Sequence, residues 1–439
     1  MQVKKIVAIF YLMYTAYILI ICGMTDITVL YILPALGALW LSYACFAGGA
    51  RLSGRLQTQR IPISLPNYIS LRPGEQALLW AAAIFGSMVC SVFVVHFYTG
   101  MWPAAVVRNL LTGVSNYYTY AYYFAEYVAD LSAFAKLPYI LMNAFIMAVF
   151  AFGVVYWGFR PRVTPGALLM ALLCSAGYLC VSVGRGTNIE LYLFVILVVY
   201  IILRRVKLAL ALDHFSARII KTLLLCFCVG LALVAVYYVV LDARGYHPQV
   251  WITEDIMYDS STLIARYLPT FALLILNLFG YLGFGLFYIA SFMQEVWVAS
   301  PVNFLAAFLP GGYSLLVGEN TISIMERTID VGVKWHADLI NGVNTFGIFG
   351  LFLLIGLLGF VCEKQEALGG QWSHMLEFLI LLQMLSFPVG NFVVVSSGTR
   401  ILALLVIAAS VVRRRPQTAA ANAAAPAEGT EQNITQQMG

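Results

Sequence analysis

The feature that most constrains this chain is a series of apolar segments, each close to the length a helix needs to cross a bilayer. A transmembrane helix requires roughly 20 consecutive apolar residues. Runs of about this length occupy residues 6–24, 27–48, 76–98, 137–158, 165–183, 189–203, 220–241, 342–361, 375–393 and 401–412, the last extended back into 392–400. Further apolar stretches at 267–293 and 297–318 bring the prediction to about 10–12 transmembrane helices.

The composition supports the same class of protein. Hydrophobic residues make up 62% of the 439 residues and charged residues 10%, whereas a soluble domain is about half apolar and about a quarter charged. This excludes an ordinary soluble enzyme and predicts an all-α, polytopic integral membrane protein with a single transmembrane domain over residues 1–415. The net charge of +5 is too small and too scattered to indicate a nucleic-acid partner.

The two ends of the chain and the cysteines add smaller constraints. The start, MQVKK followed by an apolar run, lacks a small-residue cleavage site, so we predict a retained first helix rather than a signal peptide. Residues 416–439 are rich in Ala, Gln and Thr and are predicted to form a disordered cytoplasmic tail. The eight cysteines lie in or beside apolar runs and offer no CxxC pair or disulfide framework.

The distribution of basic residues predicts the orientation, because loops rich in Lys and Arg stay on the cytoplasmic side. Seventeen of the 25 basic residues fall on one set of alternate loops, which places both termini in the cytoplasm. The other set forms two long outward loops at about 99–136 and 242–341 and carries the remaining eight: Arg108, Lys136, Arg185, Arg244, Arg266, Arg327, Lys334 and Arg400. An even number of crossings is then required between 267 and 318, where Pro301, Pro310 and two glycines predict an irregular helix or a re-entrant segment.

Arg185 is the first candidate site residue. It lies in the short turn Gly184-Arg185-Gly186-Thr187-Asn188 between two predicted helices. A guanidinium there can bind a phosphate bidentately at the level of the lipid headgroups, or it can serve as an anchor to lipid phosphate. Arg244, Arg266 and Arg400 are also outward and near helix ends, so several cations could meet one anion.

Two further segments carry candidate residues. Residues 314–350 contain Glu319, His336 and Asp338, which suit general acid/base catalysis; a solvated amphipathic helix is the alternative. Residues 117–127 hold seven aromatic side chains, among them Tyr117, Tyr118, Tyr120 and Tyr123. Tyrosines suit both a membrane interface and stacking against sugars. The chain has no GxSxG, P-loop, HExxH or DxD motif, so neither a nucleotide substrate, a metal nor another cofactor is expected.

The layout resembles bacterial O-antigen polymerases (Wzy-type oligosaccharide repeat-unit polymerases), with the enterobacterial common antigen polymerases nearest in pattern. The resemblance rests on the number of helices, the two unequal outward loops, Gly184 to Asn188 opening a helix, and His336 leading into Asn344-Thr345-Phe346-Gly347-Ile348-Phe349-Gly350. It covers roughly residues 160–410, and its motifs are short. Arg108 precedes Gly113 by five residues, which departs from the Arg-x10-Gly form of some polymerases.

This resemblance implies a GT-C-type glycosyltransferase of the bacterial inner membrane, active in lipopolysaccharide and related polysaccharide biosynthesis. Its substrate would be an undecaprenyl-pyrophosphate-linked glycan, and a chain-length regulator protein would be a partner. Arg185, with Arg266, Arg400 and Arg244, would bind the pyrophosphate, while His336, Glu319 or Asp338 would accept the proton of the acceptor hydroxyl. Tyr117, Tyr118, Tyr120 and Tyr123 would contact the glycan. O-antigen ligases share the pattern of His336 with Gly347 and Gly350; a transporter or flippase and a membrane O-acyltransferase are the alternatives from other classes.

Overall fold

The computed structural model describes most of the predicted helices. The described residues are 2–25, 29–56, 73–112, 114–159, 164–187, 189–211, 251–253, 256–257, 261–268, 272, 276, 283–287, 289, 337–368, 371–390, 399 and 401–406. The predicted span at 220–241, the stretch at 297–318 and the predicted tail at 416–439 lie outside this part of the chain. Only scattered residues of 267–293 are described.

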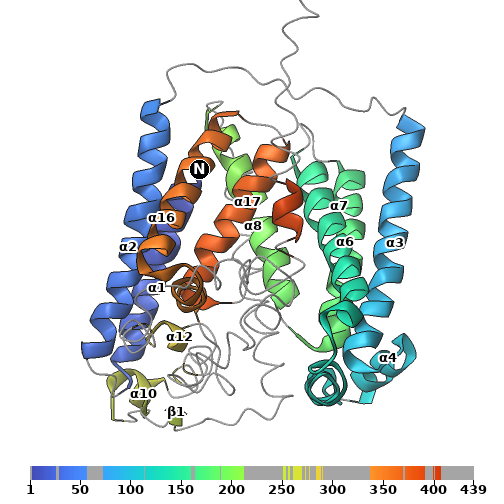
Figure 1. Ribbon diagram of the computed structural model, residues 1–439, viewed down its shortest axis with the longest axis horizontal. Coiled ribbons are helices and arrows are strands. Elements are labelled where there is room, and N and C mark those ends of the chain that lie inside the picture. Colours follow the sequence, from blue (N-terminus) through green and yellow to red (C-terminus); the bar gives the residue numbers. More distant parts are fainter. Residues whose placement is uncertain are drawn as a thin grey trace, which may run out of the picture.

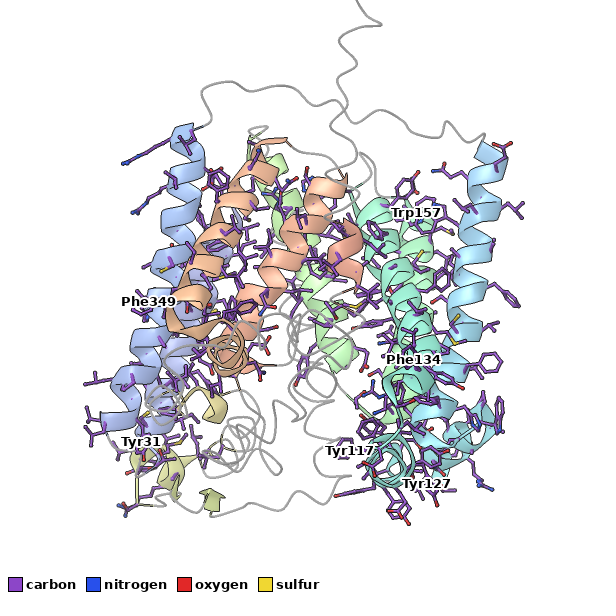
Figure 2. All side chains as sticks on the ribbon, viewed as in Figure 1. Tyr31, Tyr117, Tyr127, Phe134, Trp157 and Phe349 are labelled. Carbon is purple, nitrogen blue, oxygen red and sulfur yellow. The ribbon has the colours of Figure 1, made fainter. Side chains whose placement is uncertain are left out.

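Long helices dominate the described structure and confirm the predicted helical membrane fold. Five are long and apolar enough to span a bilayer: α1 (Val3–Cys22), α2 (Val29–Leu56), α3 (Pro73–Thr99), α6 (Ala133–Gly158) and α7 (Pro165–Arg185). Three more long helices are α8 (Ile189–Ala211), α16 (Asp338–Leu368) and α17 (Gln371–Val389). Large apolar side chains such as Leu30, Phe85 and Phe349 are exposed on these helices, and Figure 2 shows side chains projecting outward from α2 and α3. Such an apolar exterior suits lipid rather than water.

The helices form two groups joined by a central pair. Figure 1 shows α2 and α16 on one side, α3, α6 and α7 on the other, and α8 with α17 between them. The N-terminus of α1 lies toward one end of the bundle, which we call the N-terminal end. The shorter elements α4 (Pro103–Thr112), α10 (Leu263–Tyr267), α12 (Phe284–Phe287) and β1 (Trp251–Thr253) gather at the opposite end.

Glycines allow two pairs of described helices to cross closely. A Cβ atom on Gly49 of α2 would stand 1.8 Å from the Gly356 carbonyl oxygen of α16, and one on Gly359 of α16 would stand 2.0 Å from the Phe46 carbonyl oxygen. Gly177 and Gly184 of α7 face Ser87 and Val95 of α3 in the same manner. Small residues permit such backbone approach, which drives helix association where water supplies no hydrophobic force.

The two predicted outward loops contain short elements of regular structure. The 99–136 segment is largely helical, because α4, α5 (Asn116–Tyr123) and the π-helix η1 (Phe124–Val128) fill it before α6 begins. In the second loop, β1 pairs antiparallel with β2 (Ile256–Met257). This short pairing satisfies a few polar backbone groups without a helix, and the described structure stays predominantly helical, as predicted.

Candidate functional site

Arg185 is the last residue of α7, and local sequence explains where that helix starts and stops. Thr164 caps the first turn by accepting a hydrogen bond from the Ala167 N–H at 3.2 Å, and Pro165 follows it. Gly186 ends the helix in the left-handed conformation, with φ of 63°. A Cβ atom there would lie 2.5 Å from the Tyr117 backbone nitrogen. Only glycine therefore lets α5 approach the end of α7 this closely.

The guanidinium of Arg185 is enclosed by groups from three segments. Its Nη2 donates to the Tyr120 hydroxyl at 2.9 Å, and its Nη1 lies 3.4 Å from Glu190 Oε1. The Tyr98 and Tyr120 rings lie 5.3 and 4.6 Å from the guanidinium carbon, within the range of cation–π attraction. The side chains of Arg185 and Glu190 are 19% and 6% exposed. The guanidinium of Arg185 is thus fixed in orientation and largely shielded from water, unlike an anchoring side chain that moves freely at the surface.

Neighbouring groups orient Glu190, whereas one nitrogen of Arg185 has no hydrogen-bond partner among the described residues. Glu190 Oε2 accepts a hydrogen bond from the Thr187 hydroxyl at 2.8 Å, so one of its oxygens is held by the turn itself. Arg185 Nε is buried and has no hydrogen-bond partner among the described residues. A buried unpaired donor carries a desolvation cost that an incoming anionic acceptor would relieve.

The tyrosines of the 117–127 segment divide into two groups. Tyr120 contacts Arg185, while Tyr117 packs near Tyr118 and Tyr120, with ring centroids 6.1 and 6.3 Å apart. Tyr123 lies against Gly100 and has its ring centroid 4.8 Å from that of Tyr127. Tyr118, Tyr122 and Tyr127 are exposed instead. Figure 2 labels Tyr117 and Tyr127 at the same end of the molecule as α4.

The other predicted site residues are placed elsewhere or lie outside the described part. Asp338 begins α16, is fully buried and accepts a hydrogen bond from Gln383 of α17 at 3.2 Å. Arg266 is exposed in α10. Asp338 is not among the described residues that contact Arg185, which are Tyr98, Tyr120 and Glu190. In Figure 1, α8 and α17 lie between α7, which ends at Arg185, and α16, which begins at Asp338. Arg244, Glu319, His336 and Arg400 lie outside the described residues.

A buried network near the N-terminal end was not predicted. Arg204 of α8 contacts Glu377 of α17 at 2.6 Å and Glu366 of α16 at 3.4 Å. The Tyr200 hydroxyl donates to Glu377 Oε2 at 2.8 Å, and the Val3 N–H of α1 donates to Glu366 Oε1 at 2.6 Å. Four helices therefore meet at this network. Glu366 lies beyond the predicted span of its helix; burial raises the pKa of its carboxyl, although Val3 N–H and Arg204 oppose this rise.

Sequence signals for this network exist but do not identify it. Glu377 is an acid inside a predicted span, and Arg204 directly follows another predicted span. An ionisable residue in such a position usually faces a partner inside the bundle. The identity of that partner is not visible in the sequence, because 173 residues separate Arg204 from Glu377.

Comparison of the chain with models of protein families, with curated proteins and with solved structures finds no match in any of the three. The fold itself defines a predominantly helical integral membrane protein. Within the part that the structure describes, its two clusters of buried charge are the Arg185 cluster (Tyr98, Tyr120, Arg185, Thr187 and Glu190) and the Arg204 network (Val3, Tyr200, Arg204, Glu366 and Glu377).

Proposed function

We propose that this protein is a GT-C-type glycosyltransferase that polymerises undecaprenyl-pyrophosphate-linked oligosaccharide repeat units at the periplasmic face of the bacterial inner membrane. The observation that carries the proposal is the Arg185 cluster: a desolvated guanidinium at the end of an apolar helix, in contact with Tyr120 of a tyrosine-rich segment. The resemblance of the Gly184–Asn188 turn to O-antigen polymerases supports the same reading.

The proposed reaction places negative charge where this cluster can stabilise it. The acceptor hydroxyl attacks the anomeric carbon of the donor chain, the bond from that carbon to the pyrophosphate oxygen breaks, and undecaprenyl pyrophosphate departs. Preorganised donors in a water-poor site stabilise such developing charge. Arg185 Nε, which has no hydrogen-bond partner among the described residues, is the donor proposed to meet the pyrophosphate, while the hydrogen bond to Tyr120 holds the guanidinium in place.

The proposed roles of the other site residues rest on the sequence. Arg244, Arg266 and Arg400 are the proposed additional pyrophosphate ligands, and His336, Glu319 or Asp338 is the proposed base for the acceptor hydroxyl. Asp338 would need to exchange its contact with Gln383 for the substrate. O-antigen ligases perform the same displacement with another acceptor, so the ligase activity is a close variant of this proposal.

A transporter or flippase is the second candidate, and one observation favours it. The Arg204 network buries an arginine and two glutamates between helices, and charged side chains inside a membrane bundle commonly mark an ion or substrate pathway. A transporter would move lipid-linked glycan across the bilayer without lengthening it.

A reconstituted assay separates these functions. Purified protein in liposomes is incubated in EDTA with lipid-linked repeat units, and the products are resolved on a gel. We expect a ladder of lengthening chains without added metal or nucleotide sugar. Transfer of a single chain to another lipid acceptor would instead indicate a ligase, and movement of unchanged glycan into the liposome lumen a flippase. A ladder that appears only after metal is added, or from nucleotide sugar alone, would contradict the proposed mechanism.

A further inference from the structure

The exposed side of α5 and η1 combines aromatic rings with carboxylates. Tyr118, Tyr122 and Tyr127 are 56%, 68% and 57% exposed. Glu126 and Asp130 are exposed in the same segment. We call these five residues the tyrosine–carboxylate surface. None of its three tyrosines is part of the Arg185 cluster.

The helix geometry aligns the tyrosines along one side. Tyr118 and Tyr122 are four residues apart and share a face of α5. The following turn is π-helical, with the Ala129 N–H donating to the Phe124 carbonyl at 2.8 Å. A π-turn accommodates an extra residue, so the five-residue step from Tyr122 to Tyr127 keeps the third ring exposed alongside the others.

The carboxylates distinguish among the partners that such rings would suit. Exposed tyrosines alone fit the headgroup region of a bilayer, but Glu126 and Asp130 would repel lipid phosphates. Lys136, whose Nζ donates to the Ala129 carbonyl at 2.7 Å, offsets only one of these two negative charges. An uncharged saccharide meets no such repulsion. Its C–H faces can pack on tyrosine rings, while its hydroxyls donate hydrogen bonds to the carboxylate oxygens.

The same helix connects this surface to the Arg185 cluster. Tyr120 lies between Tyr118 and Tyr122 in α5 and is directed to Arg185, to which it is hydrogen bonded at 2.9 Å. A saccharide on the exposed side would therefore be held by the helix that also supports the cation proposed to bind its pyrophosphate.

We propose that the tyrosine–carboxylate surface binds an uncharged saccharide chain. In the proposed function this chain is the glycan of the lipid-linked substrate, and the inference depends on that function for this identification only. This proposal changes the residues expected to contact the glycan. Tyr118 is still expected to contact it, and Tyr122 and Tyr127 are added. Tyr120 is instead expected to orient Arg185, to which it is hydrogen bonded.

Saturation-transfer NMR with soluble oligosaccharides tests the surface without lipid, pyrophosphate or turnover. Maltoheptaose, chitohexaose and a mannan oligosaccharide serve as probes for the full-length protein in nanodiscs. We expect at least one probe to bind and the Y122S/Y127S variant to weaken its affinity by about tenfold, the loss expected from removing two stacking rings. Tyr31→Ser, which removes an exposed tyrosine at the start of α2, should leave binding unchanged.

Matched helix content and melting temperature must show that Y122S/Y127S is folded. Glu126→Gln gives a second readout, because it keeps the shape but weakens the acceptor and should reduce binding several-fold. Absence of binding to every probe by the wild type, or unchanged binding by folded Y122S/Y127S, would overturn the inference. A wild type that makes a polymer ladder but binds no probe rejects this surface alone; one that binds a probe but makes no ladder rejects the polymerase and leaves the surface.

Discussion

Arg185 illustrates how a single residue can be both a structural contact and a catalytic candidate. Its hydrogen bond to Tyr120 and its pairing with Glu190 hold the side chain in one orientation. An anchor to lipid phosphate would gain nothing from this enclosure. A cation that must meet charge as it develops benefits, because its orientation is set before the reaction.

Substitutions at Arg185 should lower polymerisation per amount of folded protein. Arg185→Ala removes the preorganised donors and should reduce the rate by about 10²- to 10³-fold. Arg185→Lys keeps the charge but loses the planar fork, so it should be impaired less severely. Chain length on a polysaccharide gel, with an immunoblot for expression, measures both. As a control, Arg51→Ala replaces an exposed arginine near the C-terminus of α2 and should leave polymerisation almost unchanged. Normal polymerisation by Arg185→Ala would refute the proposed role of Arg185 in binding the pyrophosphate.

The turn around Arg185 could be predicted from the sequence, whereas its partners could not. Two glycines beside an arginine between apolar runs indicate a helix end with a cation at the headgroup level. Tyr120 is 65 residues earlier in the chain, and Tyr98 comes from another helix again. Contacts of this kind depend on how the helices pack against one another and produce no recognisable pattern in the local sequence.

The helices themselves were largely predictable, since long apolar runs correspond to α1, α2, α3, α6, α7, α8, α16 and α17. The short helices α4 and α5 were missed. Helices of fewer than about 12 residues are marginal in isolation, and their stability comes from packing. Asn116, for example, joins α5 to α7 by donating to the Val183 carbonyl at 3.1 Å.

At the contact between α2 and α16, neighbouring glycines should respond differently to the same substitution. Gly49→Ala would place a methyl group 1.8 Å from a backbone oxygen, so the helices must separate; overpacking of this kind costs about 1 to 3 kcal/mol. Gly48→Ala meets no atom within 4 Å and should be neutral or slightly stabilising, because alanine favours a helix. Melting temperatures in detergent measure the difference. Equal effects of the two changes would contradict this packing.

The whole molecule separates its chemistry between two ends. The Arg185 cluster and the tyrosine–carboxylate surface lie toward the end with α4, where Figure 2 labels Tyr117 and Tyr127. The Arg204 network, which includes Val3 at the start of α1, lies toward the N-terminal end (Figure 1). In the proposed orientation, the end with α4 faces the periplasm.

Labelling of intact cells tests this orientation. In a background with all eight cysteines replaced by serine, a membrane-impermeant thiol reagent should label Tyr127→Cys but not Arg55→Cys, both of which replace exposed residues. Permeabilised cells should label both and so provide the control. Labelling of Arg55→Cys alone in intact cells would invert the proposed topology.

The Arg204 network also imposes an order on biogenesis. Its arginine and Glu377 are 173 residues apart, so at a synthesis rate of about 5 to 20 residues per second the arginine emerges roughly 9 to 35 s before its counter-ion. The backbone N–H of Val3 is made even earlier relative to its acceptor, because Glu366 follows 363 residues later. During this interval the arginine can remain at the headgroup level, where its long side chain reaches water. We therefore expect α8 and α17 to pack together late in synthesis, after the helices that surround them have entered the membrane.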